Sequence, residues 1–297
     1  VIRRGGNTDP GACTFAVVSG ETSVVSHAST TAAGVGFTKL ATCTALTIKG
    51  DGTSTLANHT ATFQTASAPL TLNLDNGTKG AFTFTRGQTG STALTINSTG
   101  AANTTGVLDF DNATALKTVT INAAVDLTAT LAADFAASTA MTVSGAASKV
   151  DLDAAALSAN VKTFDASGLT AGGARIAVDQ TDATVDTMFK GGAGADMLNI
   201  GKVVYSSATL TADGGAGDDT LVVNDQAAIT TATAKNISNF EILSLTDDND
   251  GALDTFNAST LSGITSIKIA ADSAADGYAV TGITAAQAGA ITFTGAQ

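Results

Sequence analysis

Short runs in which apolar and polar residues alternate recur along the chain at a nearly constant distance. Five of them have an apolar-Thr-apolar core, and their last apolar positions are Ile48, Leu72, Ile96, Ile121 and Val143, with successive steps of 24, 24, 25 and 22. A looser series continues at Ile200, Val223, Leu245, Ile269 and Phe293, with successive steps of 23, 22, 24 and 24. Alternation with a period of two is typical of strands, and a constant step of this length predicts a repeat architecture.

We therefore expect an all-β fold, a right-handed parallel β-helix similar to a β-roll, with coils of about 24 residues and few short helices. One inward ladder would contain Leu46, Leu70, Leu94, Val119 and Met141, and the next Ile48, Leu72, Ile96, Ile121 and Val143. Outside, Thr47, Thr71, Thr95, Thr120 and Thr142 would line up, with Asn73, Asn97 and Asn122 beside them. Second strands are expected at 61–65, 81–85, 107–111 and 127–131. An antiparallel sandwich or barrel also has short regular strands, but it gives no reason for the constant step.

The same unit continues through the chain, and we divide it by composition. Residues 1–45 are expected to form an N-terminal cap and the first coils, 46–180 a Thr/Ala-rich solenoid, and 181–297 a cation-binding solenoid in the same stack. Ala-rich residues 151–161 and 227–236 are candidates for short helices.

Charge narrows the possible partners. The net charge is −12, and all acidic residues except Glu21 and Glu241 are Asp. Aspartate is favoured in turns and where hard cations bind. An acidic surface with few lysines argues against nucleic-acid binding, and no apolar run reaches the ~18 residues of a membrane span.

Two features concern the maturation of the chain. It begins at Val1 without a charged-then-apolar leader, so we expect a processed product or a fragment. Cys13 and Cys43 both lie near the N-terminus. In an extracellular protein they would form a disulfide, and the alternative is a pair of buried free thiols.

Two nonapeptides carry the most specific chemistry. Residues 191–199 read GGAGADMLN and residues 214–222 read GGAGDDTLV, and both fit Gly-Gly-x-Gly-x-Asp-x-(large apolar)-x. The glycines permit backbone turns that a Cβ resists. Because the interval between the two nonapeptides is close to the period of the repeat, we expect them on the same edge of adjacent coils, with Asp196 and Asp219 reaching into the gap.

The nonapeptides, the preference for Asp over Glu and the Thr/Ala/Gly-rich coils resemble RTX-type secreted proteins of Gram-negative bacteria, and most closely their surface-layer proteins. Residues 237–246 and 253–269 look like the linking repeats of that group. The resemblance implies Ca²⁺ between the two turns, with carboxylate ligands from Asp196 and Asp219. It also implies carbonyl ligands from Gly191, Ala193, Gly215 and Gly217.

Other acidic residues lie close to these turns. Asp213 and Asp218 flank the second turn and are available to complete the shell. One coil further, Asp248 and Asp250 belong to an acidic turn that either holds a second Ca²⁺ or is simply solvated. Because stacked carboxylates repel one another, we expect Ca²⁺ to order residues 185–255.

The chain lacks the common signatures of catalysis. His27 and His59 lie in Thr/Ser-rich segments without acidic neighbours, and the sequence contains neither a nucleophile elbow nor a phosphate-binding loop. We expect a non-enzymatic extracellular structural protein, exported by type I secretion, that assembles with itself into a calcium-stabilised surface layer or filament at the cell surface. Cell-surface polysaccharide is a further candidate partner. The alternative function is a module of an RTX adhesin that binds glycans or other cells.

Overall fold

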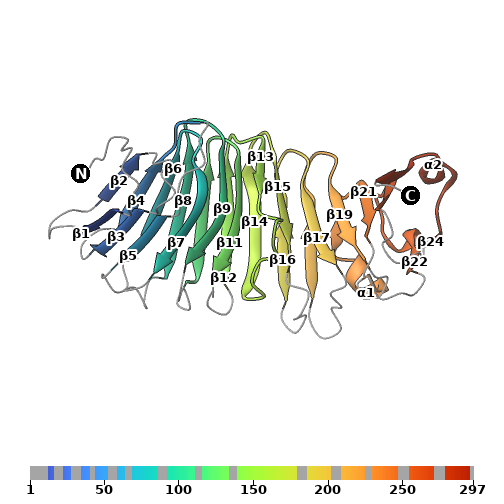
Figure 1. The fold of residues 1–297 in the computed structure, drawn as a ribbon. Coiled ribbons are helices and arrows are strands. Elements are labelled where there is room, and N and C mark those ends of the chain that lie inside the picture. Colours follow the sequence, from blue (N-terminus) through green and yellow to red (C-terminus); the bar gives the residue numbers. More distant parts are fainter. Residues whose placement is uncertain are drawn as a thin grey trace.

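A computed structural model describes most of the 297 residues. The described residues are 13–16, 23–27, 35–40, 44–52, 59–63, 69–85, 92–110, 116–133, 139–178, 186–201, 209–224, 229–246, 254–270 and 278–294. Figure 1 shows their strands following one another side by side from the N-terminus (blue) to the C-terminus (red).

Two long parallel sheets make up the fold, and we name the 13-stranded one sheet A and the 10-stranded one sheet B. Sheet A consists, in order, of β1 (Cys13–Ala16), β3 (Val35–Leu40), β5 (His59–Phe63), β7 (Lys79–Thr85), β9 (Asn103–Phe110), β11 (Leu127–Ala133), β13 (Lys149–Asp151), β15 (Gly173–Ala177), β17 (Met197–Gly201), β19 (Thr220–Val223), β21 (Ile242–Leu245), β23 (Ser266–Ala270) and β25 (Ile291–Thr294). Sheet B consists, in order, of β2 (Ser23–His27), β4 (Ala45–Lys49), β6 (Leu70–Asp75), β8 (Ala93–Thr99), β10 (Thr118–Ala123), β12 (Thr139–Gly145), β14 (Val161–Leu169), β16 (Thr187–Lys190), β18 (Leu210–Asp213) and β20 (Ile237–Ser238).

The remaining elements are short. A two-stranded parallel sheet pairs β22 (Asp254–Asn257) with β24 (Tyr278–Thr281). The described helices are α1 (Thr231–Ala234), α2 (Ala285–Ala288) and the 3₁₀ helix η2 (Ala258–Thr260). Of the two expected helical segments, α1 lies within residues 227–236, whereas residues 151–161 form turns and strand ends, so that expectation was wrong. No helix in the described part of the chain is long and apolar enough to cross a membrane.

From β1 to β20 the chain alternates between the two sheets, and every pairing in them is parallel, so each of these coils contributes one strand to sheet A and one to sheet B. After β20, the strands between those of sheet A are β22 and β24, which pair with each other. This is a parallel β-solenoid, as the sequence predicts. The expected second strands correspond to β5, β7, β9 and β11 of sheet A. Pairings such as β2 with β4 and β15 with β17 run across the two composition boundaries, so the stack is continuous there.

The predicted ladders are confirmed over β6, β8, β10 and β12. Leu70, Leu94, Val119 and Met141 are partners in one buried column, and Leu72, Ile96, Ile121 and Val143 in the next. The column of Thr71, Thr95, Thr120 and Thr142 lies between them on the outer face. Apolar burial along these columns is the main source of cohesion between coils.

The predicted register is wrong at β4. Leu46 pairs with Leu72 and Ile48 with Leu74, so the step between these coils is longer by two than the one predicted. Both registers keep the apolar side chains inside, because a shift by two preserves the face of a strand. Thr47 therefore lies beside Asn73 and not beside Thr71.

Thr47 begins a ladder of polar side chains on the outer face of sheet B. Asn73 Nδ2 donates to Thr47 Oγ1 at 3.0 Å, Asn97 Nδ2 to Asn73 Oδ1 at 2.7 Å, and Asn122 Nδ2 to Asn97 Oδ1 at 2.8 Å. The ladder ends at Ser144, whose Oγ donates to Asn122 Oδ1 at 3.3 Å. The predicted stacking of the three asparagines is confirmed, and each amide is both donor and acceptor, so the ladder can repeat without charge.

The second series of apolar positions belongs to the other sheet. Val223, Leu245, Ile269 and Phe293 are register partners in β19, β21, β23 and β25 of sheet A. The first series lies in sheet B. Ile200, the first member predicted for this series, is out of register, because a shift after Asn199 makes Gly201 the partner of Val223. The sequence therefore predicts the period in both halves, but the two series follow different faces of the solenoid.

The buried columns and the outer threonines should respond differently to truncation. Ile121→Ala removes a side chain that is fully buried and should lower the free energy of unfolding by about 2–5 kcal/mol. Thr142→Ala changes an exposed neighbour on the adjacent strand and should cost less than about 0.5 kcal/mol. Denaturant unfolding monitored by circular dichroism measures both values, and equal losses would contradict the assignment of the two faces.

Candidate metal centre

The two glycine-rich turns lie at the same edge of adjacent coils, as expected. The first connects β16 to β17 and the second connects β18 to β19. Gly191 N donates to Asp213 O at 2.8 Å, and Ala216 N donates to Gly192 O at 3.1 Å, so the turns are hydrogen-bonded to one another directly. The interval between the two nonapeptides is thus one full coil.

Glycine is required here because the turns touch through their backbones. A Cβ on Gly191 would collide with the Gly214 carbonyl oxygen, and a Cβ on Gly214 would collide with that of Asn239. Gly217 also has a φ of +133°, which side chains resist. The repeat of glycine therefore sets how closely three successive coils approach.

Asp196 and Asp219 lie directly over one another, where the chain leaves each turn and enters sheet A. Their following residues, Met197 and Thr220, are register partners, and both aspartates are 1% exposed. Asp196 Oδ1 accepts from Ala174 N at 2.6 Å, and its Oδ2 accepts from Gly192 N at 2.8 Å. Asp219 Oδ1 accepts from Asp196 N at 2.7 Å.

One more acidic residue belongs to this arrangement. Glu241 occupies the same position in the next coil, and its Oε2 accepts from Asp219 N at 2.9 Å. We name the successive positions Ala174, Asp196, Asp219, Glu241 and Thr265 the corner column. Each of its three acidic members accepts the N–H of the member one coil before it.

Glu241 was not among the residues predicted for the site. The signal was present, because Glu241 follows Asp219 by nearly the interval at which Asp219 follows Asp196, and it is one of only two glutamates. It lacks the glycines that marked the other two positions. Its longer side chain reaches the same N–H group of the preceding coil.

The same corner carries a neutral version of this contact earlier in the stack. Asn103 is 1% exposed, and its Oδ1 accepts from Thr78 N at 2.7 Å. Its Nδ2 donates to Ser98 Oγ at 2.9 Å and to the Leu74 carbonyl at 3.2 Å. An amide satisfies both kinds of neighbour, whereas a carboxylate can only accept.

The other predicted ligands are placed differently. Asp213 ends β18, and its Oδ1 accepts from Gly215 N at 3.1 Å and from Asn239 Nδ2 at 2.7 Å, so it holds the second turn against the next coil. Asp218 is exposed beside Asp219. Asp248 and Asp250 lie outside the described residues, as does Cys43, so the second cation site and the disulfide stay predictions.

The corner column has an unfavourable electrostatic environment. Burial raises the pKa of Asp196 to about 6, although two backbone N–H groups oppose this effect. The pKa of Asp219 is raised to about 7 by burial together with the charges of Asp196, Glu241 and Asp218, although the hydrogen bond from Asp196 N opposes this effect. Ion pairs in the described part of the chain involve Lys49, Lys149 and Arg175 with other aspartates, and none of them reaches the column.

The donor atoms fit Ca²⁺ in kind. Asp196 and Asp219 supply carboxylate oxygens, and the carbonyls of Gly191, Ala193, Gly215 and Gly217 accept no hydrogen bond from any described residue. Together these six groups reach the lower end of the ~6–8 oxygen ligands that Ca²⁺ takes. The described residues contain no cluster of three or more His, Cys, Asp or Glu side chains suited to a metal, so backbone carbonyls would have to supply most ligands.

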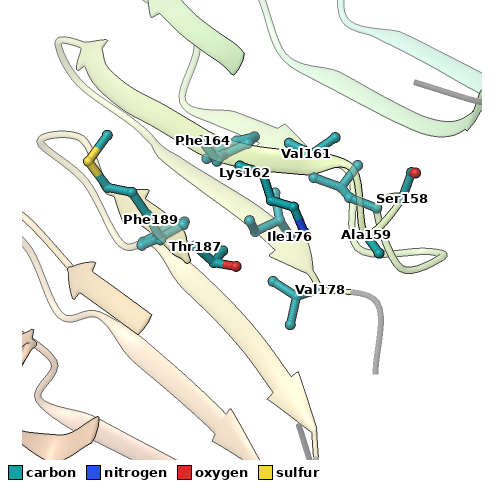
Figure 2. Close-up of a pocket in the computed structure, with 11 residues that line it drawn as sticks. Ser158, Ala159, Val161, Lys162, Phe164, Ile176, Val178, Thr187 and Phe189 are labelled. Carbon is teal, nitrogen blue, oxygen red and sulfur yellow. The ribbon is translucent and has the colours of Figure 1, made fainter. Parts of the chain in front are cut away.

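A second feature, an apolar pocket, lies where β14, β15 and β16 meet (Figure 2). Its lining includes Leu157, Val161, Phe164, Ile176 and Val178. Lys162 is the one charged side chain among the lining residues, which include no His, Cys, Asp or Glu. His27 and His59 lie on β2 and β5, in different sheets and away from this pocket in the strand order.

No family model, no curated protein and no solved structure matches this chain.

The raised pKa values predict how stability depends on pH without calcium. A carboxyl whose pKa is higher in the folded state contributes stability that is complete below its unfolded pKa and is lost as the pH rises through the folded pKa. For Asp196 and Asp219 this window runs from 3.8 to about 7. In chelator-treated protein we expect the free energy of unfolding to fall by about 1–3 kcal/mol between about pH 5 and about pH 7.5.

Two variants test the origin of that loss. Asp219→Asn keeps an oxygen that can accept the Asp196 N–H but has no charge, so the pH dependence should become clearly smaller. Asp165→Asn is the matched control, because the pKa of Asp165 is lowered by hydrogen bonds from Ser167 and its titration lies below this window. An unchanged slope in Asp219→Asn would show that other groups cause the pH dependence.

Proposed function

We propose that this chain is a non-catalytic extracellular structural protein whose solenoid is stabilised by Ca²⁺ and which assembles with itself into a surface layer or filament. The observation that carries the proposal is the pairing of Asp196 with Asp219 on adjacent glycine turns. Both side chains are buried and without a cationic partner among the described residues. A buried charge without a counter-charge is strongly unfavourable, and a divalent cation is the simplest compensation.

The ligand chemistry supports Ca²⁺ rather than a softer metal. All candidate donors are oxygens, which hard cations prefer, and transition metals would be expected to recruit His or Cys. The residues that would hold the ion are Asp196 and Asp219 with the carbonyls of the two turns. When bound, Ca²⁺ supplies positive charge that offsets the repulsion between the stacked carboxylates.

The position of the site supports a structural role. It lies between β16–β17 and β18–β19, where it would link successive coils of one continuous stack. Binding energy at such a position becomes folding energy. Extracellular calcium-binding modules have dissociation constants of about 10⁻⁴–10⁻³ M, so the stack would be strengthened outside a cell and weaker inside it.

Calcium should therefore raise the stability of the protein at neutral pH. At about pH 7.5 we expect ~5 mM Ca²⁺ to raise the Tm by at least ~3 °C relative to chelator, and the same concentration of Mg²⁺ to have little effect, because ligand binding to the folded state stabilises it. Differential scanning calorimetry measures the shift. Isothermal titration with CaCl₂ measures the affinity independently of unfolding.

Variants connect this effect to the site. Asp196→Asn and Asp219→Asn should abolish the calcium-dependent shift while keeping the far-UV circular dichroism of the chelator-treated protein. Asp165→Asn, on an Asx turn outside the column, should keep the full shift. Identical midpoints of the wild type in Ca²⁺ and in chelator would refute calcium stabilisation.

A further inference from the structure

The C-terminal end of the described stack leaves part of the core uncovered. Phe293 of β25 is the register partner of Ile269, which is buried in the core. Phe293 itself is 60% exposed, the highest value among the large hydrophobic residues whose exposure the structure describes. It occupies a core-facing column but has no described coil over it, and among the described strands β25 pairs only with β23.

Among the described residues, this edge has none of the usual protection against pairing. Edge strands are normally blunted by charged residues, proline or bulges. Residues 278–294 contain no charged residue and no proline, in a chain with a net charge of −12. The pairing of β25 with β23 is regular, without a register shift. An uncharged, regular edge beside an exposed phenylalanine is suited to receive another parallel strand.

The opposite edge of sheet A offers a strand of the same kind. β1 reads Cys-Thr-Phe-Ala and pairs in parallel with β3 alone among the described strands. β25 reads Ile-Thr-Phe-Thr. In both strands the Thr-Phe pair occupies the second and third positions, and β1 is uncharged as well. A single register therefore aligns the two edges along their whole length.

We propose that copies of this chain join head to tail, with β25 of one copy pairing in parallel with β1 of the next. In this register Ile291 lies opposite Cys13, and Phe293 lies opposite Phe15. The contact is heterologous, so it generates an open filament when the rotation does not close. This proposal rests on the self-assembly put forward as the function and specifies the strands that carry it.

Cross-linking tests the register. In a Cys43→Ser background, Ile291→Cys places a thiol opposite Cys13 of the next copy, within the ~4.4–6.8 Å between Cα atoms that a disulfide needs. Thr292→Cys is the matched control, because adjacent residues of a strand point to opposite faces. After oxidation in the presence of Ca²⁺, we expect a reducible ladder of oligomers on a non-reducing gel from Ile291→Cys and none from Thr292→Cys.

A second pair of variants tests the end surface without cysteine chemistry. Phe293→Lys should abolish sedimenting assemblies while leaving the Tm of the monomer within ~2 °C, because the substituted side chain is already largely exposed. Val107→Lys makes the same change at a 42% exposed position on the side of the stack, and it should assemble like the wild type.

The outcomes separate the two proposals. If the wild type assembles but Ile291→Cys gives no disulfide ladder, or if Phe293→Lys still assembles, head-to-tail pairing is overturned and self-assembly is left intact. A wild type that stays monomeric in Ca²⁺ by analytical ultracentrifugation would overturn both. A ladder in Ile291→Cys together with loss of assembly in Phe293→Lys supports the pairing of β25 with β1.

Discussion

Parallel stacking places each residue directly over its counterpart in the next coil, and the rest of the structure depends on this constraint. Each side chain in a column must be able to pack or hydrogen-bond against a similar side chain one coil before it and one coil after it. Apolar columns such as Leu72, Ile96 and Ile121 satisfy it by burial. The Asn73, Asn97 and Asn122 ladder satisfies it because an amide donates to one neighbour and accepts from the other.

Carboxylates are the residues for which this constraint is hardest to meet. In the corner column, Asp196 and Asp219 repeat a negative charge at the spacing of neighbouring strands, about 4.8 Å, and backbone N–H groups compensate them only in part. The glycine turns bring carbonyl oxygens to the same corner. A cation between coils would supply the positive charge that the stacked carboxylates lack. A following copy would supply the next strand that the end of the stack lacks.

Aromatic columns also repeat from coil to coil, but the size of the side chain can change within one column. Phe164 stacks on Phe189 at 5.8 Å between ring centroids, and Phe189 is followed in its column by the small Ala212. Phe240 packs against Phe189 at 6.2 Å. A column of the core thus accepts both large and small residues when an aromatic ring from another position of the coil lies close by.

The sequence by itself determined the solenoid, its nearly constant step, the inward ladders and the stacking of Asp196 on Asp219, because these follow from periodicity. It did not determine the register at Leu46, since a shift by two buries the same face. It did not reveal that its two apolar series lie in different sheets, because period alone carries no phase across residues 143–200. Only the tertiary structure brought Glu241 into the corner column and paired the Asp213 side chain with Asn239, because such contacts depend on the side-chain reach and turn geometry of neighbouring coils.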